Sequence, residues 1–454
     1  MKQLISLSSK RIISTVCLAT LIFSTAFNQK QTYDIGIIAG TLINGTGNKP
    51  LQNKLILIAG GKIIDIVDAA LLKNYSCKTV IDSHDKFIIP GLFDMHGHVT
   101  MIDRTIDTTN NNFQWQVKYN RAAAEWVLRS LLYFGITNVR ETGDLLNEGL
   151  TLKRDVEANK IAGPHLFACG PLIESGTPRF LSMSSVVNTE EEAIAEVQRE
   201  AKAGVDIIKI YATVPSKLTN VIINEAHRNN KKVIGHLGAT SWNDAVKFGI
   251  DGLVHAPTGL YRNFETDSDS TKALLQAMRD QKIENDPTLY VGNCVFQKDS
   301  VPIYLERYLP ESIKTGWAEE NGVVAKLIMP HFDFDKDYNG NLNYVKKAYE
   351  MGVDILAGSD FNNPNTYPGY SLHKELQELS KAGIPNDSLI KIATYKAAEW
   401  LGVLNKTGTV EKGKDADIII LNKNPLLKIE NTLEIDKVIQ HGKIIKRDGL
   451  LTPG

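Results

Sequence analysis

The sequence predicts an α/β protein: a (β/α)8 TIM barrel with a small β-sandwich domain built from both chain ends. Three observations predict this fold. Short apolar runs alternate with amphipathic segments through the middle of the chain, β-rich stretches lie at both ends, and histidines follow several of the apolar runs. With 454 residues, the chain is long enough for one large barrel and one smaller domain. The expected division is 1–26 as a signal peptide, 27–90 and 402–454 as the two parts of the sandwich, and 91–401 as the barrel.

The amino-acid composition is that of a globular protein and does not narrow the class of function further. Hydrophobic residues make up 43% of the chain and charged residues 23%, with a formal net charge of −1. No basic patch or acidic run indicates a nucleic-acid partner. The expected partner is therefore a small molecule, and a homo-oligomer stays open.

The amino end has the pattern of a secretory signal peptide. Basic residues precede the almost wholly apolar segment 12–23, and small residues follow at 24–26. We expect cleavage near Ala26, export to the periplasm or the exterior, and no stable membrane span afterwards. An uncleaved anchor, or a lipoprotein on Cys17, stays open. The other cysteines are odd in number and widely spaced, which does not indicate a disulfide framework: Cys77, Cys169 and Cys294.

Both chain ends predict short strands. In the first end, apolar or β-branched runs are broken by Asn-Gly and Gly-Gly turns, at residues 35–38, 55–58 and 63–67, with helical character only around 69–75. In the second end, the predicted strands are residues 408–410, 416–421, 438–440 and 443–447. Neither half is large enough to bury a good core alone, so we expect them to pack together as one sandwich.

The middle of the chain predicts eight strand–helix units. The first strand precedes His96 and is read from the apolar run 87–90; the others are 136–139, 165–168, 207–211, 233–237, 253–256, 289–291 and 355–358. Predicted helices between them include 117–134, 190–203, 218–229, 242–248 and 271–281. Segment 301–352 carries more than one helix, as an insertion in the outer layer. In such a barrel, functional residues lie at the carboxyl ends of the strands.

Six residues of metal-ligand type fall at those strand ends: His96, His98, Lys209, His236, His255 and Asp360. On a strand, residues i and i+2 share a face, so the pair in His-Gly-His can hold one ion. Taken singly, each histidine could be a core residue bonded to backbone, and Asp360 could cap the next turn. Lys209 lies between two isoleucines, where an inward amine is costly unless it is paired, deprotonated or modified.

Four segments carry a family resemblance: residues 40–47 (GTLINGTG), 89–98 (IPGLFDMHGH), 352–360 (GVDILAGSD) and 413–418 (GKDADI). On these motifs the chain resembles the metal-dependent amidohydrolase superfamily over nearly all of its mature length. Residues 135–140 (GITNVR) and 206–211 (DIIKIY) look most like its imidazolonepropionase-like and prolidase-like branch.

The resemblance implies a dinuclear metal site. His96, His98 and Asp360 would bind one ion, and His236 and His255 the other. Lys209, carboxylated on its amine, would bridge the two. Zinc suits this histidine-rich set best, with manganese, iron or cobalt left open. A bridging hydroxide would attack the substrate carbonyl, and Asp360 would act as general base and then as general acid.

Substrate contacts are read from position alone. Tyr211 lies two residues past Lys209 and should share its face, as an oxyanion or carboxylate donor or as a packing residue at the barrel mouth. Arg179 and Arg262, in loops after the third and sixth strands, could bind a carboxylate or simply be solvated. Five histidines are interpreted as structural: His165, His227, His331, His373 and His441.

The leading hypothesis is thus an exported metal-dependent amidohydrolase that cleaves amide bonds in dipeptides. The alternative is a mononuclear, imidazolonepropionase-like hydrolase of cyclic amides or lactones, in which Lys209 stays unmodified. A third hypothesis is a non-catalytic metal-binding protein on the same fold.

Overall fold

A computed structural model describes residues 32–453, apart from 110–113, 258–263, 297 and 332. The predicted signal peptide, residues 1–26, lies outside the described residues. Among the helices that are described, none is both long and apolar enough to cross a bilayer.

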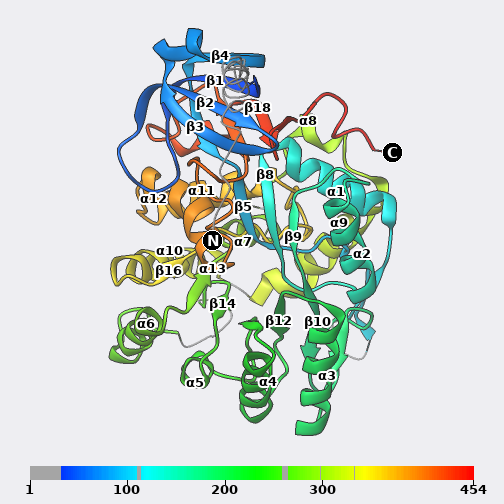
Figure 1. The fold of residues 1–454 in the computed structure, drawn as a ribbon. Coiled ribbons are helices and arrows are strands. Elements are labelled where there is room, and N and C mark those ends of the chain that lie inside the picture. The colour runs from blue at the N-terminus through cyan, green and yellow to red at the C-terminus, as the bar shows by residue number, and fades with distance from the viewer. Residues whose placement is uncertain (1–31, 110–113, 258–263, 297, 332, 454) are drawn as a thin grey trace, which may run out of the picture.

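The strands of both chain ends form one sheet of seven, at the top of Figure 1. Its order is β19-β18-β17-β4-β1-β2-β3. The bounds are β1 (Thr32–Leu42), β2 (Leu51–Ala59), β3 (Lys62–Asp68), β4 (Ser76–Pro90), β17 (Ile418–Leu421), β18 (Ile435–Gln440) and β19 (Lys443–Ile444), with a 3-10 helix, η1 (Ala69–Asn74), between β3 and β4. The two ends meet where β17 pairs antiparallel with β4, for example Ile419 opposite Ile89.

This sheet curls on itself, which differs from the two facing sheets of the predicted sandwich. The amide of Ile63 in β3 donates to the carbonyl of Lys414 (2.8 Å), and Gly413 donates back to Ile63 (2.7 Å). The outer strand β3 therefore reaches the segment that precedes β17. Buried isoleucines such as Ile37 and Ile418 fill the enclosed core. Residues 408–410, predicted as a strand, form turns and coil.

Eight parallel strand segments follow one another through the middle of the chain, and hydrogen bonds join the last to the first. They are β5 (Leu92–Gly97), β8 (Ile136–Glu141), β9 (His165–Phe167) continued by β10 (Cys169–Glu174), β12 (Ile207–Ile210), β13 (Lys232–Gly235), β14 (Gly252–Val254), β15 (Glu284–Asp286) and β16 (Asp354–Ile355). The closing bonds run from Met95 to Ala357 (2.9 Å) and from Asp360 to His96 (2.8 Å). The predicted α/β class is confirmed. The carboxyl ends of these strands, which are far apart in sequence, meet at one rim of the ring.

Helices lie outside these strands (Figure 1). Their bounds are α1 (Arg121–Tyr133), α2 (Leu146–Glu157), α3 (Glu190–Ala203), α4 (Ser216–Arg228), α5 (Trp242–Phe248), α6 (Asp269–Gln281), α7 (Leu289–Val295), α8 (Ile303–Glu306), α9 (Glu311–Val323), α10 (Phe334–Glu350), α11 (Tyr370–Lys381), α12 (Asn386–Lys391) and α13 (Ala397–Trp400). Three short strands, β6 (Asp103–Asp107), β7 (Gln114–Lys118) and β11 (Ser184–Val186), lie in the loops. The bounds predicted for α3 and α5 are confirmed; α3 begins at a capping box between Thr189 and Glu192.

The seventh strand was assigned to the wrong residues. Segment 289–291 begins helix α7, and the strand is β15, five positions earlier. The helix forms because a distant carboxylate caps it: Glu375 of α11 accepts from the amides of Leu289 (3.0 Å) and Tyr290 (2.7 Å). A local apolar pattern carries no information about that contact.

The first strand also differs from its prediction. Residues 87–90 end β4 and belong to the curled sheet, whereas His96 lies in β5 itself. Gly91 separates the two strands and donates its amide to the carbonyl of Asp417 (2.9 Å). One continuous stretch of chain therefore leads from the curled sheet directly to the first strand of the ring.

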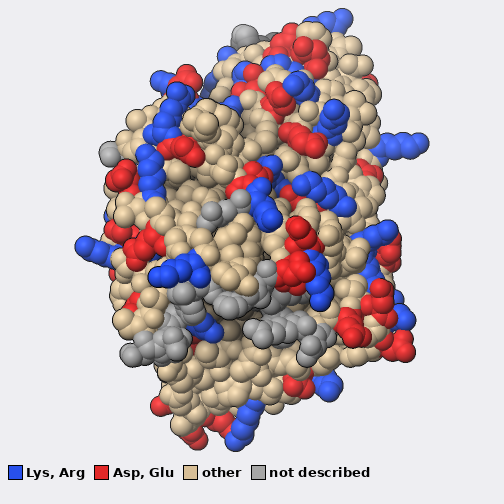
Figure 2. All heavy atoms as spheres, turned by 180° about the vertical axis from the view of Figure 1, so that it is seen from behind, with Lys and Arg blue, Asp and Glu red and all other residues tan. Residues whose placement is uncertain are grey.

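On the face seen in Figure 2, lysine and arginine side chains alternate with aspartate and glutamate. The described atoms of this face therefore carry no broad field of one sign.

His373 of α11, predicted to be structural, joins two distant segments. Its Nε2 donates to the carbonyl of Phe134 (2.9 Å), which leaves Nδ1 to accept from the hydroxyl of Thr432 (2.9 Å). Burial lowers the pKa of His373 from its ordinary 6.5 to about 4.

This burial predicts a pH-dependent stability. The unfolded state takes up the His373 proton below pH 6.5, and the folded state only near pH 4. The free energy of unfolding should therefore fall as the pH drops through this window, by about 2 kcal/mol between pH 7 and pH 5 from this group alone. Urea unfolding of the wild type and of His373→Asn at both pH values measures the difference. Equal losses of unfolding free energy in the two proteins would contradict the assignment of this pH dependence to His373.

Candidate functional site

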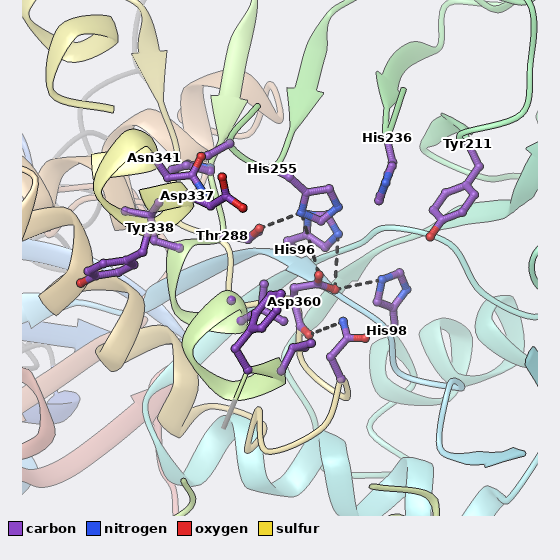
Figure 3. A pocket seen from close by; sticks show the side chains of 18 of the residues that line it. His96, His98, Tyr211, His236, His255, Thr288, Asp337, Tyr338, Asn341 and Asp360 are labelled. Atoms are coloured by element: carbon purple, nitrogen blue, oxygen red, sulfur yellow. Dashed lines mark hydrogen bonds and ion pairs between the residues drawn. The ribbon is translucent and has the colours of Figure 1, made fainter. Parts of the chain in front are cut away.

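A cavity of 450 Å³ opens at the carboxyl ends of the strands. Its wall includes all six predicted ligands: His96, His98, Lys209, His236, His255 and Asp360. Tyr211 lines it as well, and Figure 3 shows most of these side chains converging on one space. The structure therefore brings together residues that are spread over most of the barrel sequence.

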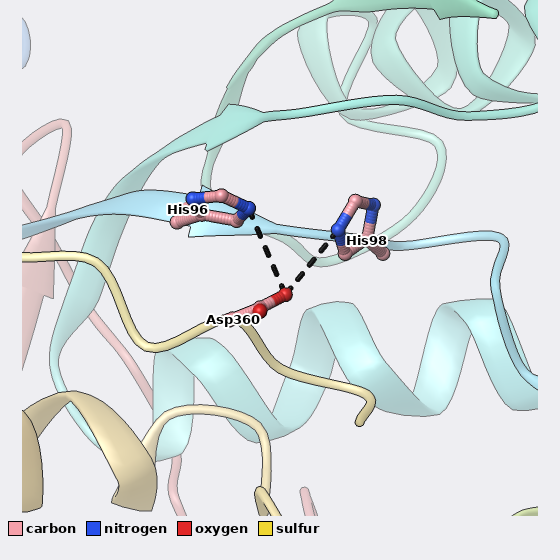
Figure 4. A group of neighbouring side chains, drawn as sticks. All are labelled: His96, His98 and Asp360. Atoms are coloured by element: carbon pink, nitrogen blue, oxygen red, sulfur yellow. Dashed lines mark ion pairs between the residues drawn. The ribbon is translucent and has the colours of Figure 1, made fainter. Parts of the chain in front are cut away.

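His96, His98 and Asp360 form the tightest group, with one candidate ligand atom from each within 4.8 Å of the others (Figure 4). The Nε2 atoms of His96 and His98 lie 3.7 and 3.4 Å from Oδ1 of Asp360. Two imidazole nitrogens and one carboxylate oxygen on a common centre are a donor set suited to Zn²⁺ and related divalent ions.

Hydrogen bonds orient both histidines for this purpose. Nδ1 of His96 lies 2.9 Å from Oδ2 of Asp286, and Nδ1 of His98 lies 2.9 Å from the carbonyl oxygen of Gly143. Because each acceptor takes a proton from Nδ1, the lone pair of each ring lies on Nε2, which faces Asp360. Such partners fix the tautomer and the ring orientation of metal-binding histidines.

Asp286 is in turn held by a buried guanidinium. Arg140 donates from Nη2 to Oδ2 of Asp286 (2.7 Å), from Nη1 to Glu284 (2.5 Å) and from Nε to the carbonyl of Met95 (2.6 Å). All three charged side chains are fully buried. The network connects β8, β15 and β5 beneath the cavity.

A second carboxylate, Asp94, connects the first strand to the last. It accepts from the amide (2.9 Å) and the hydroxyl (2.6 Å) of Ser359 and from the amide of His96 (3.2 Å). Burial raises the pKa of Asp94 to about 7. Asp360 follows with a positive φ of 54°, a conformation that persists in a non-glycine residue only where its surroundings enforce it.

His236 and His255 lie beside the first group. Their ring centroids are 4.5 Å apart, and His255 is 4.9 Å from the ring of His96. Nδ1 of His255 is 2.7 Å from the hydroxyl of Thr288. Burial lowers the pKa of His236 to about 3 and that of His255 well below its ordinary value. Both rings are therefore neutral at physiological pH, the form that binds a metal.

Lys209 is 1% exposed and opens onto the same cavity. Its amine forms no hydrogen bond or ion pair with another described residue, and burial lowers its pKa to about 8. Its positive charge contributes to the lowered pKa values of His96, His236 and His255. A neutral amine is the form that adds to CO₂, so the environment suits carboxylation.

Of the three residues predicted to contact the substrate, only Tyr211 lines the cavity among those that the structure describes. The ring of Tyr211 packs on His236 with centroids 4.5 Å apart and meets Phe180 edge-on. Arg179 is exposed and does not line the cavity, although its charge contributes to the lowered pKa of His236. Arg262 lies outside the described residues.

Sequence reasoning missed several residues of the site. Asp286 and Thr288 orient histidines, but Asp286 ends and Thr288 follows a polar strand, β15, that the apolar pattern did not reveal. Asp94 was visible within the His-Gly-His segment, and its position two residues before His96 was the available signal. Helix α10, in the segment interpreted only as an insertion, supplies four lining residues: Phe334, Asp337, Tyr338 and Asn341.

Comparisons with known proteins give related sequences and structures. A family model described as the amidohydrolase family matches residues 87–252 and 336–445. Ochratoxinase of Aspergillus niger is 25% identical over 462 residues, covering 91% of this chain and 87% of its own. An imidazolonepropionase of Picrophilus torridus is 24% identical over 407 residues, covering 86% of this chain and 92% of its own.

Solved structures show the same fold. A Xaa-Pro dipeptidase with methionine bound in its active site superposes with a TM-score of 0.69 at 23% identity, over 90% of this chain and 99% of that one. A putative prolidase from Bifidobacterium longum gives a TM-score of 0.70 at 23% identity, over 92% and 95%.

The contact between Asp286 and His96 predicts the effect of a neutral substitution. Asp286→Asn removes the anionic acceptor, so the affinity for Zn²⁺ should fall about 10- to 100-fold. Competition with a chromophoric chelator measures it. The matched control is Asp251→Asn, which alters another Asp–His pair, to His227 (2.9 Å), on a residue that does not line the cavity. Equal affinities in the two variants would contradict the role of Asp286.

Proposed function

Because the chain belongs to the amidohydrolase family and is a hydrolase that acts on carbon–nitrogen bonds, we propose that it cleaves the amide bond of dipeptides with bound divalent metal ions. The observation that carries the proposal is the group of His96, His98 and Asp360, with both imidazoles oriented by hydrogen bonds and the buried Lys209 beside them.

The proposed site holds two ions, most suitably Zn²⁺. His96, His98 and Asp360 would hold one, and His236 and His255 the other, with carboxylated Lys209 between them. The donor chemistry fits: neutral imidazoles from both pairs face one space, and a carbamate would turn a buried amine without a partner into an anionic oxygen ligand.

When bound, the ions would lower the pKa of water and polarise the substrate carbonyl. The chain's own residues supply the rest. Asp360 projects its carboxylate toward His96 and His98 and can take a proton from the attacking water and deliver it to the leaving nitrogen. Tyr211, packed against His236, can donate a hydrogen bond from its hydroxyl to the developing oxyanion.

A second candidate function comes from the similarity to imidazolonepropionase. In that case the chain would hydrolyse a cyclic amide or lactone with one ion, held by His96, His98 and Asp360, and Lys209 would remain an amine. The dipeptidase and prolidase neighbours share the fold at 23% identity, which leaves the substrate class itself a proposal.

Location and organisation are proposed from the sequence pattern alone. We propose that the protein is exported after removal of residues 1–26 and that 27–90 and 402–454 form one domain beside the barrel of 91–401. Cell fractionation and the amino-terminal sequence of the mature protein test the first proposal.

The role of Asp360 predicts a specific loss. Asp360→Asn removes the proton acceptor but keeps an oxygen donor, so kcat on a cleaved dipeptide should fall at least about 100-fold while the fold is retained. The zinc-reconstituted protein is first screened against a dipeptide library, and the variant is assayed on the best substrate. Thr366→Ala, which removes a hydroxyl 3.3 Å from the Asp360 carbonyl, is the control. Unchanged turnover in Asp360→Asn would contradict the proposal.

The state of Lys209 separates the two candidate functions. The dinuclear proposal predicts close to two ions per chain and a native mass increased by one CO₂, both lost in Lys209→Met. Metal analysis and native mass spectrometry measure them in bicarbonate buffer. One ion per chain with Lys209 unmodified, together with hydrolysis of a lactam or lactone, would instead support the second function.

A further inference from the structure

Away from the candidate ligands, the cavity wall is mainly apolar. Six of the side chains on it show this character: Met101, Leu172, Phe180, Val291, Val295 and Phe296. They come from strand β10, from separate loops and from helix α7, so the apolar surface extends around much of the cavity. An uncharged part of a substrate can bind there by burial alone.

Asp337 of α10 is an acidic residue on this otherwise mainly apolar wall. Apart from Asp360, it is the only acidic residue among the described residues of the wall. Figure 3 shows it on the side of Thr288 and His255, with Asn341, one helical turn further on, beside it. Its carboxylate forms no hydrogen bond or ion pair with another described residue, although the side chain is half-buried. A carboxylate in such a place is available to a ligand.

The helix does not need this carboxylate for its own start. Asp333 already caps α10, accepting from the amide of Lys336 (3.2 Å), and of the two acids in the first turn, Asp335 and Asp337, only Asp337 lines the cavity. Packing contacts hold the helix that carries Asp337 in place. Its neighbour Tyr338 donates to Glu378 of α11 (2.5 Å), and Tyr344 is fully buried against the core.

The charges around the cavity define the kind of group that would bind. Among the described lining residues the only cationic side chain is Lys209, at the ligand end, and none is an arginine. A substrate cation near α10 would meet Asp337 and the aromatic rings of Phe296 and Phe334, whose centroids are 5.4 Å apart. Aromatic faces attract ammonium and guanidinium groups. The amine of Lys298 already lies over the ring of Phe334 (5.1 Å), so Asp337 is the group that would hold the substrate cation.

We propose that Asp337 is a specificity-determining residue, which binds an ammonium or guanidinium group of an amide substrate while the apolar wall receives the uncharged part. This inference rests on the proposed function and names its substrate class. The cationic group could be the free α-amine of a dipeptide or a basic side chain, and the two sources share the same chemistry.

The test compares matched substrates. Dipeptides that differ only by lysine against norleucine have nearly the same size, and each is made with a free and with an acetylated α-amine. We expect the wild type to favour the compounds that carry the recognised cation by about tenfold or more in kcat/KM, through KM. Asp337→Asn should remove this preference by raising KM for the cationic compounds to the value of their neutral matches. Asp335→Asn, an exposed acid of the same helical turn, should retain it.

Binding provides a readout that does not need turnover. Calorimetry on zinc-loaded Asp360→Asn should give about tenfold tighter binding of the cationic compound than of its neutral match, and the double variant with Asp337→Asn should bind both equally. Equal binding in the single variant, or a preference that survives Asp337→Asn, would overturn the inference. Hydrolysis of no dipeptide at all by the wild type, with the binding preference intact, would contradict only the proposed function.

Discussion

The buried contact between Asp286 and Arg140 determines where the candidate ligands lie. Arg140 is positioned by two carboxylates and a backbone carbonyl, and Asp286 then fixes the ring of His96. The cluster of Arg140, Glu284 and Asp286 joins one positive to two negative side chains, so it contains one carboxylate more than its single cation can balance. Burial, together with the charge of Glu284, raises the pKa of Asp286. A cation above His96 would oppose that rise, and hence the cluster favours occupancy by a positive ion.

The position of most candidate ligands at one rim could be predicted from sequence, because a parallel α/β pattern brings strand ends to one rim whatever the loop lengths are. His236 and His255 were placed in this way, each directly after an apolar run. The same reasoning failed at the seventh strand. There the buried residues are Glu284, Asn285 and Asp286, which no hydrophobic period detects, because their burial depends on partners in other strands such as Arg140.

The substrate side of the cavity was far less predictable, for a related reason. An amphipathic pattern indicates that segment 334–350 is helical, but the turn that faces the cavity is set by packing against α7 and α11. Asp337 was therefore invisible as a lining residue, whereas Arg179, chosen for its charge, is exposed. Local sequence predicts which elements form, and tertiary contacts decide which of their side chains meet the ligand.

The ligand group of His96, His98 and Asp360 lies on the seam between the first and last strands of the ring. The packing there leaves no room: a Cβ at Gly358 would lie 2.5 Å from the Cβ of His96, and one at Gly97 would lie 2.1 Å from the ring of Phe361. The curled sheet adjoins the same seam, because β4 runs into β5 and pairs with β17. The pairing of the two chain ends thus supports the closure that holds the candidate ligands together, which gives the curled sheet a direct structural part in the site.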